Sequence, residues 1–230
     1  APPKLYDLTS LQRDTNRLLG YTAQQTPDYA QSLYEKKLAT YPRTDSRYLT
    51  GDMVAGLPEL VNLTAMRLPF TRVPLPGDVT LVVDDAKVSD HHALLPTNAV
   101  RDLDWSTLPT GECNILTILI VRLACAVGES HIFEAVTAVL ECAGVHFTAK
   151  GKTVLHDGWK TLDAAFRTWL KKGGADDATE DGNEDVRALP ELTEGQSFQA
   201  VEVSVREGKT SPPKRYTEVI CYERGIRNRP

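Results

Sequence analysis

The sequence has few cysteines and no apolar run long enough to cross a membrane. Its four cysteines in 230 residues form neither a Cys-x-x-Cys pair nor the dense pattern of a disulfide-rich secreted domain. The apolar stretch ILTILIVRLACAV at 115–127 is shorter than a membrane span and contains Arg122. We therefore expect reduced thiols, no zinc site, no membrane partner and a cytoplasmic protein.

The sequence also lacks the excess of basic residues that is typical of nucleic-acid-binding proteins. It carries 26 Lys and Arg residues against 31 Asp and Glu residues, which gives a net charge of −5. Six of the acids lie in the segment 173–185, which contains no base, so the remainder has a net charge of +1. We expect a mobile acidic surface loop over 173–185, and the charge balance does not exclude DNA.

Two short helices are predicted near the N-terminus. Thr9 or Ser10 is a candidate N-cap for a helix over 9–20, which Gly20 would end in a left-handed conformation. Thr26 is a candidate N-cap for a second helix, which would end near residues 39–40 because Pro42 follows. The apolar positions of this second helix, which include Tyr29 and Tyr34, predict one buried face.

The remainder of the first half is predicted to be mostly helical, and the second half β-rich. Short helices interrupted at Pro58, a segment extended through Val83 and an apolar helix over 112–127 complete residues 1–130. Period-two β-runs follow from His131, with hairpin turns at Ala143–Gly144 and Gly151–Lys152 and a further run at 197–205.

The predicted fold class is therefore α+β. A helical domain resembling a helix-turn-helix occupies 1–130, and part of an antiparallel β domain occupies 131–210. Residues 211–230 are expected to start a further segment or to form an aberrant tail.

The stretch LYEKKLATYPRTDSRYLT, residues 33–50, carries the first candidate site. Pro42 favours extended geometry at Tyr41, and residues two apart in extended chain share a face, so the Tyr41 hydroxyl and the Arg43 guanidinium should lie on one side. A phenol has a pKa of about 10, so ionising it at pH 7 costs roughly 4 kcal/mol, and a nearby cation lowers this cost. Tyr41 and Arg43 are a candidate nucleophile and phosphate clamp. The alternative is an ordinary packed tyrosine.

His91 and His92 follow in a polar loop. Neighbouring residues point to different faces, so at most one of them is expected to meet a shared site, and a capping histidine beside a solvent histidine is an equally open interpretation. Asp102 and Asp104 form an Asp-x-Asp pattern, which we interpret as helix or turn caps. No metal site is predicted within the chain.

Four segments together resemble the type IA DNA topoisomerases, in the form of bacterial topoisomerase III. YPRTDSRYL resembles the active-site motif of that family, and DAKVSDHHALLPT resembles its histidine segment. GVHFTAKGKTVLHDGW and KTSPPKRYTE resemble two further segments, in the family's order.

The resemblance implies an isomerase that cuts one DNA strand and rejoins it without ATP. Tyr41 would form a 5′-phosphotyrosine link, Arg43 would hold the scissile phosphate, and His91 would be the active-site histidine. The residues implied to contact DNA, chiefly single-stranded DNA, are Thr44, Asp45, Arg47, His92, Lys36 and Lys37.

The resemblance also implies parts that this sequence does not supply. The family holds Mg²⁺ with a Glu and Asp-x-Asp cluster in an N-terminal Toprim domain, and nothing upstream of Tyr41 matches it. We expect a central fragment of a longer bacterial protein that is associated with nucleoid or plasmid DNA, partnered with the rest of its parent chain and inactive alone. The alternative is a non-catalytic helix-turn-helix module in which Tyr41 and Arg43 only contact phosphate.

Overall fold

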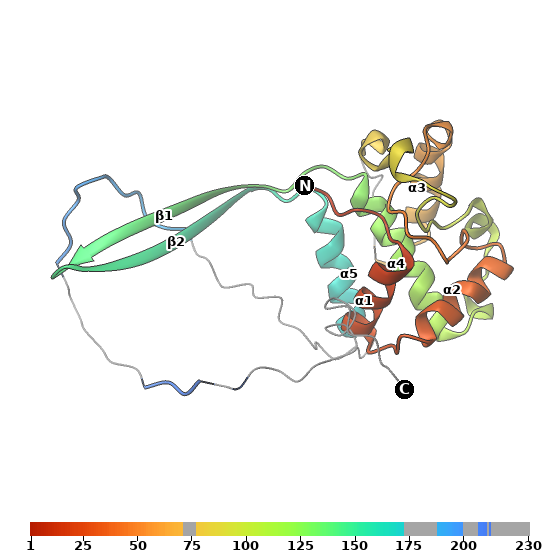
Figure 1. Ribbon diagram of the computed structural model, residues 1–230, viewed down its shortest axis with the longest axis horizontal. Helices are drawn as coiled ribbons and strands as arrows, with labels where there is room; N and C mark the ends of the chain where they lie inside the picture. Colours follow the sequence, from red (N-terminus) through yellow and green to blue (C-terminus); the bar gives the residue numbers. More distant parts are fainter. Residues whose placement is uncertain (71–76, 173–187, 200–206, 211, 213–230) are drawn as a thin grey trace. The chain divides into compact units, whose positions relative to one another are not determined.

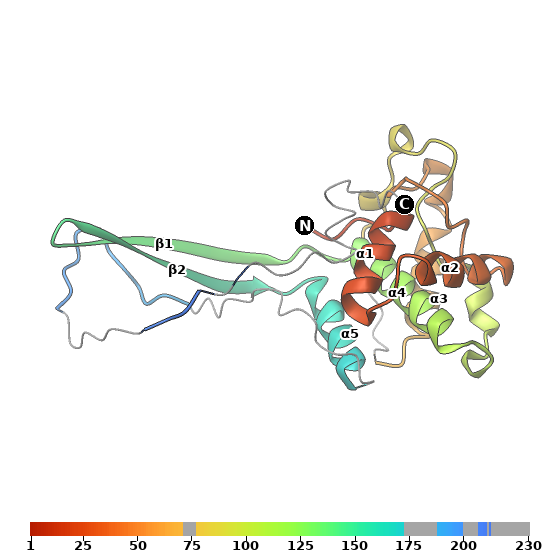
Figure 2. The ribbon, with the colours of Figure 1, turned by 60° about the horizontal axis from the view of Figure 1, so that its bottom comes forward.

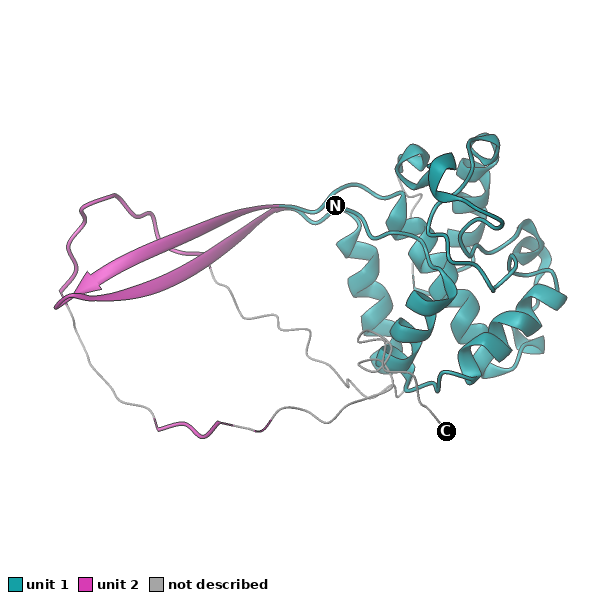
Figure 3. Ribbon diagram, in the orientation of Figure 1, with its two compact units in different colours: residues 1–132, 156–180 teal, residues 133–155, 181–230 magenta. Residues whose placement is uncertain are grey.

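The computed structural model describes residues 1–70, 77–172, 188–199, 207–210 and 212 (Figure 1). These residues form five α-helices, a two-stranded β-hairpin and several 3₁₀ turns, so the predicted α+β class is confirmed. The chain divides into two compact units, residues 1–132 with 156–180 and residues 133–155 with 181–230 (Figure 3).

Helix α1 (Leu8–Leu19) begins with a capping box at Asp7. The Asp7 carboxylate accepts a hydrogen bond from the Ser10 amide at 2.6 Å, and the Ser10 hydroxyl lies 3.2 Å from the Asp7 amide. The prediction that Thr9 or Ser10 caps this helix was therefore wrong, because the cap lies two residues upstream of Thr9. Gly20 ends the helix with a left-handed φ of 67°, as predicted.

Helix α2 (Gln25–Glu35) differs from its prediction at both ends. Thr26 is not the N-cap, because it lies inside the helix after the cap residue Gln24, and its buried hydroxyl lies 2.7 Å from the Thr15 hydroxyl. The helix ends at Glu35, before residues 39–40, because Lys37 adopts a left-handed φ of 61°. The Leu38 amide then donates to the Leu33 carbonyl at 2.8 Å, which closes the end of the helix.

Helix α4 (Thr110–Ala126) confirms the predicted apolar helix and forms the centre of the first unit. Thirteen of its 17 residues are buried, so it has no solvent-facing stripe and must be covered on several sides. Helices α2, α3 (Leu57–Ala65) and α5 (Lys160–Lys172) all pack against it, as the two views in Figures 1 and 2 show.

Three further predictions for this unit were wrong. Pro58 lies in the first turn of α3, where it suits the start of the helix and does not interrupt it. The segment Val79–Val82 is a 3₁₀ turn capped by Asp78, not extended chain. Helix α5 was missed because its first residues were taken as a continuation of the β-run; it buries Leu162 and Phe166 at a four-residue spacing.

Four other short 3₁₀ turns join the helices of the first unit. They span Gly51–Met53, Asp85–Lys87, Asn98–Asp102 and Trp105–Thr107.

The second unit contains the hairpin of strands β1 (Ile132–Cys142) and β2 (Val145–His156). Ala143 and Gly144 both have left-handed φ values, 52° and 78°, so the predicted tight turn is confirmed there. Gly151 lies inside β2, and the predicted turn at Gly151–Lys152 was therefore wrong. Residues 197–199 form no strand, and the rest of that predicted run and the acidic segment 173–185 lie outside the described residues.

Two remaining sequence predictions concern thiols and membranes. Cys113, Cys125 and Cys142 are free thiols, and Cys221 lies outside the described residues. Within the described ranges, no helix has both the length and the apolar composition that a membrane span requires.

Candidate active site

Tyr41 and His91 lie in contact although 50 positions separate them in the sequence. Their ring centroids are 4.5 Å apart, and the ring planes are inclined by 46°. The two segments that carry them are joined by main-chain hydrogen bonds. The Thr40 amide donates to the Leu95 carbonyl, and the Ala93 amide donates to the Tyr48 carbonyl, each at 2.9 Å.

Alternating burial orients the residues that follow Tyr41. Pro42, Thr44 and Ser46 are buried, whereas Arg43 and Asp45 are exposed, as expected of extended chain with a period of two. Arg43 and Asp45 therefore point to the solvent from the segment that presents the half-buried Tyr41. This alternation agrees with the prediction that Tyr41 and Arg43 share one side of the chain.

The buried hydroxyls fix the position of the histidine loop. Thr44 Oγ1 donates to the His91 carbonyl at 2.9 Å and accepts from the Ser46 amide at 3.1 Å. Ser46 Oγ donates to the Lys87 carbonyl at 2.8 Å. Thr44 and Ser46 thus tie the tyrosine segment to residues 87–91.

Tyr34 was not predicted to belong to the site. Its ring packs edge-on against Tyr41, with the centroids 5.4 Å apart, and its side chain is 41% exposed. The prediction that Tyr34 lies on the buried face of its helix was therefore wrong. The early end of α2 brings it beside Tyr41, and no local pattern in the sequence signals that ending.

The other residues implied to contact DNA have different surroundings. Lys36 Nζ lies 2.5 Å from the buried Glu112 carboxylate, so its charge is paired. Lys37 is exposed at the left-handed position after α2, and its carbonyl accepts from Thr97 Oγ1 at 2.5 Å. His92 is half-buried, with Nδ1 2.7 Å from the Ala93 carbonyl oxygen.

Asp45 and Tyr48 complete this surface. The Ser89 hydroxyl lies 3.4 Å from Asp45 Oδ1. The Tyr48 ring lies beneath Lys87 Nζ at 4.6 Å and Lys4 Nζ at 5.2 Å from its centroid. A hydrogen bond to Lys4 lowers the pKa of the Tyr48 hydroxyl, so Tyr48 is the competing candidate for a nucleophilic tyrosine.

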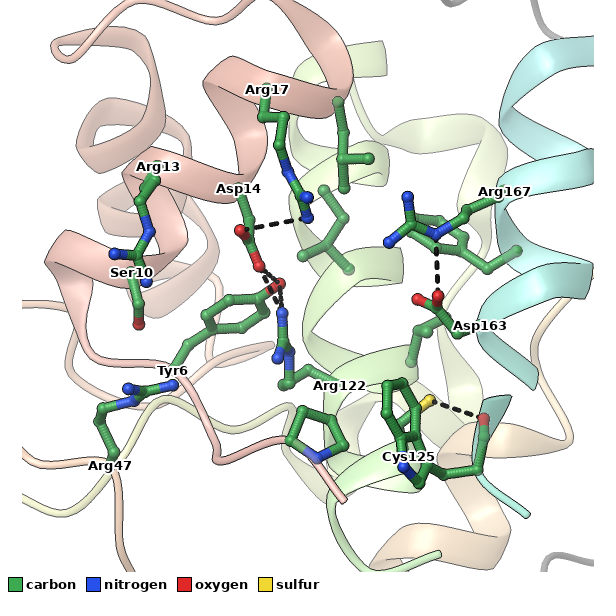
Figure 4. Close-up of a pocket in the computed structure, with 16 residues that line it drawn as sticks. Tyr6, Ser10, Arg13, Asp14, Arg17, Arg47, Arg122, Cys125, Asp163 and Arg167 are labelled. Atoms are coloured by element: carbon green, nitrogen blue, oxygen red, sulfur yellow. Dashed lines mark hydrogen bonds and ion pairs between the residues drawn. The ribbon is translucent and has the colours of Figure 1, made fainter. Parts of the chain in front are cut away.

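Arg47 lies farther along the same segment and lines a pocket of about 280 Å³ in the first unit (Figure 4). Its Nε donates to the Leu5 carbonyl at 3.1 Å. Two aspartates, Asp14 and Asp163, also line this pocket. The arginines that line it, hereafter the arginine pocket, are Arg13, Arg17, Arg47, Arg122 and Arg167. Sequence reasoning did not find this pocket, because its lining comes from positions more than 150 residues apart.

Residues 1–220 match the family model of the DNA topoisomerases. This chain belongs to the type IA DNA topoisomerases. The resemblance of its four segments to that family is thereby confirmed. The chain is 35% identical to DNA topoisomerase 3 of Bacillus cereus (strain ATCC 14579) over 222 residues. It is also 35% identical to DNA topoisomerase 3 of Bacillus subtilis (strain 168) over 223 residues.

The coverage differs greatly between this topoisomerase chain and those relatives. Each alignment covers 94% of this chain but only 29% of the relative. Among solved structures, full-length topoisomerase I from Thermotoga maritima matches this chain with a TM-score of 0.52 at 20% sequence identity. The match covers 70% of this chain and 27% of the Thermotoga chain, and it shows a shared fold.

Proposed function

We propose that this chain supplies the nucleophilic tyrosine of a type IA topoisomerase and that Tyr41 forms the covalent bond to DNA. The observation that carries the proposal is the contact between Tyr41 and His91, with the exposed Arg43 on the same segment. Membership of the family supports a DNA substrate, and the half-buried Tyr41 leaves its site open to an extended strand.

In the proposed reaction, the Tyr41 oxygen attacks the phosphorus of a phosphodiester in one DNA strand. The bond from phosphorus to the 3′-oxygen breaks, the 3′-oxygen takes up a proton, and the phenol loses one. The 5′-phosphate remains on Tyr41. After strand passage the 3′-hydroxyl attacks the same phosphorus and releases the tyrosine, so the phosphotyrosine ester retains the bond energy and no ATP is required.

Arg43 and His91 would stabilise the charge on the phosphate that is attacked. A guanidinium presents two parallel donors to phosphate oxygens, and an imidazole N–H donates a further hydrogen bond. Thr44 would act as a positioning residue, because its hydroxyl already binds the His91 carbonyl. Exposed Asp45 and Lys37, with Lys36, His92 and Arg47, would border the path of the strand.

Mg²⁺ is not assigned to this chain. Among the described residues, no group of three or more His, Cys, Asp and Glu side chains converges on one point. Asp104 accepts hydrogen bonds from the Ser106 amide at 3.0 Å and its hydroxyl at 2.7 Å, so it caps a turn as the sequence predicted. The described residues of this chain therefore do not fit the ion that the family resemblance implies.

The chain spans 29% of the length of the Bacillus relatives. We propose that a complete cycle of relaxation needs the remaining parts of such a protein and that the 230 residues alone do not relax supercoiled DNA. The full protein would act in the bacterial cytoplasm on chromosomal or plasmid DNA.

The test is covalent trapping on the full-length product of the gene that encodes these residues. A 3′-labelled single-stranded oligonucleotide is incubated with protein, the reaction is stopped with denaturant, and protein-bound label is separated on a gel. The label lies downstream of the cut because cleavage leaves the 5′-phosphate of the downstream piece on the protein. We expect the adduct with wild type and its loss in Tyr41→Phe.

Tyr34→Phe and Tyr48→Phe serve as matched controls, because each also removes one phenolic oxygen from the same surface. An adduct that persists in Tyr41→Phe and disappears in Tyr48→Phe would overturn the assignment. Reversible binding with no adduct in any variant would instead support the non-catalytic DNA-binding module.

A further inference from the structure

The arginine pocket is strongly positive in a chain whose net charge is negative. Five arginines and two aspartates line it, which leaves three positive charges in excess, whereas the whole chain carries −5. Positive charge gathered on a concave surface attracts anions more strongly than the same charge spread over a flat one. The chemistry of the lining therefore favours an anionic ligand.

The two aspartates hold arginines in place. Asp14 binds Arg122 and also accepts a hydrogen bond from the Tyr6 hydroxyl at 2.7 Å, and it lies 3.6 Å from an Arg17 nitrogen. Asp163 accepts a hydrogen bond from Arg167 Nε at 2.8 Å. A guanidinium that is already oriented loses less side-chain entropy when it binds a ligand.

Figure 4 shows that these arginines surround the pocket from separate elements of the first unit: Arg17 and Arg122 lie at Asp14, Arg167 lies at Asp163, and Arg13 and Arg47 lie on the other side of Tyr6. Arg13 and Arg17 extend from α1, Arg122 from α4 and Arg167 from α5. Planar guanidinium groups that approach from several sides match the oxygens of a phosphate group, which accept paired hydrogen bonds.

The size of the pocket limits the ligand. A volume of about 280 Å³ lies just below the usual range for pockets that bind drug-sized molecules, so it suits a phosphate with its adjoining sugar. The half-buried Trp159 also lines the pocket and offers an aromatic surface of the kind on which nucleotides stack.

Arg47 connects the arginine pocket with the proposed cleavage site. It follows Tyr41 by six residues, and a fully extended chain of that length spans at most about 20 Å. One strand of B-form DNA advances about 3.4 Å per nucleotide, so a strand at Tyr41 reaches the pocket within a few nucleotides.

We propose that the arginine pocket binds a backbone phosphate of the same DNA strand that Tyr41 attacks, at a position away from the bond that breaks. The inference rests on the proposed function, because that function makes DNA the ligand. Its test measures binding and not cleavage, so the two proposals fail separately.

The test uses the 230-residue chain and a fluorescein-labelled oligothymidine of roughly 12 nucleotides, a length typical of single-strand sites. Fluorescence anisotropy gives the dissociation constant over a range of salt concentrations. Arg13→Gln and Arg167→Gln remove one positive charge each from opposite walls of the pocket. We expect each to weaken binding about tenfold, the value for one lost hydrogen bond to a charged group. The slope of log K against log salt should fall by about 0.7 per variant.

Arg101→Gln is the matched control. Arg101 pairs with Glu59 at 2.7 Å, lies outside the pocket and carries the same charge, so its loss should change affinity by less than about twofold. Thermal melting identifies a variant that has lost its fold. If one pocket variant is unfolded, the affinity of the other pocket variant decides the test. The proposal would be overturned if Arg13→Gln and Arg167→Gln changed the affinity no more than Arg101→Gln does. It would also be overturned if the wild-type chain did not bind the oligonucleotide at low salt.

Inorganic phosphate provides the second arm, because it offers the same oxygens without a strand. Wild-type chain is titrated with phosphate at constant ionic strength while its melting temperature is followed. We expect little stabilisation by phosphate alone. Stabilisation that requires Arg13 and Arg167, together with oligonucleotide binding that does not, would make the pocket a site for a free anion and overturn the DNA proposal.

Discussion

The hydroxyl of Thr44 donates a hydrogen bond to the main-chain carbonyl of His91 across 2.9 Å. The same hydroxyl accepts a bond from the Ser46 amide, so one buried side chain satisfies groups on both segments of the candidate site. This bond acts together with the Ser46–Lys87 and Ser89–Asp45 side-chain bonds, which join the same two segments beside the contact between the Tyr41 and His91 rings. Thr44 therefore supports the geometry of the site although it does not face the solvent.

Replacing Thr44 with valine should destabilise the first unit and slow adduct formation. Valine keeps the shape but leaves the His91 carbonyl and the Ser46 amide without this partner, which costs about 1–3 kcal/mol for buried polar groups. Each kcal/mol lowers the melting temperature of a chain of this size by about 2–4 °C. Thermal melting and covalent trapping measure the two effects.

Thr44→Ser is the control, because serine retains the hydroxyl and removes only a methyl group. It should preserve most of the trapping rate. Equal rates for Thr44→Val and wild type would show that His91 needs no support from Thr44.

Replacing Arg43 with lysine should reduce the rate of DNA cleavage more than the affinity for DNA. Arg43 is exposed beside Tyr41, and lysine keeps the charge but does not present two coplanar donors to a phosphate. Single-turnover trapping gives the rate, and anisotropy gives the affinity. A lysine variant that cleaves as fast as wild type would mean that charge alone is required at this position.

Local patterns predicted those features that local chemistry determines. Gly20 ends α1 as expected because a left-handed residue after a helix strongly favours glycine. The end of α2 was misjudged because Lys37 adopts the same conformation without being glycine. Its carbonyl is held by Thr97, which lies 60 positions away.

In the candidate site, too, local sequence predicted some features, and contacts between distant segments determine the others. Tyr41 and Arg43 could be paired from the sequence, because two residues in extended chain share a face. His91 was assigned through the family resemblance, and its contact with Tyr41 depends on pairing between distant segments. The arginine pocket was missed, although Arg13 and Arg17, four residues apart on one helix, indicate a basic helical face.

Replacing Gly158 with alanine should destabilise the first unit strongly. Gly158 has a φ of 53°, and an added Cβ would lie 2.4 Å from the Glu129 carbonyl oxygen and 2.5 Å from that of Ser130. The left-handed conformation alone costs alanine about 1–2 kcal/mol, and contacts with rigid main-chain atoms add to it. We expect a loss of about 3 kcal/mol in the free energy of unfolding, measured by urea denaturation.

Gly20→Ala isolates the conformational part of that loss. Gly20 has a similar φ of 67°, but no atom lies within 4 Å of an added Cβ. Its cost should therefore remain near 1–2 kcal/mol. Equal losses for the two variants would show that the main chain around Gly158 relaxes to admit the methyl group.

The last prediction concerns Cys125, which lines the arginine pocket. Burial raises the pKa of the Cys125 thiol to about 12, well above the value of about 8.5 for an exposed cysteine. A raised native pKa means that the folded chain retains a proton that the unfolded chain loses. The stability contributed by this thiol is present below pH 8.5 and declines as the pH rises toward 12.

Urea denaturation between pH 8.0 and pH 9.5 should therefore show a smaller decline in stability for Cys125→Ala than for wild type. The single thiol contributes at most about 1.4 kcal/mol per pH unit to the slope. Cys142→Ala is the control, because it removes an exposed thiol from the same chain. A thiol reagent should also label Cys142 in the folded chain at pH 8 and reach Cys125 only after unfolding. Rapid labelling of Cys125 in the folded chain would show that the wall of the pocket opens to solvent.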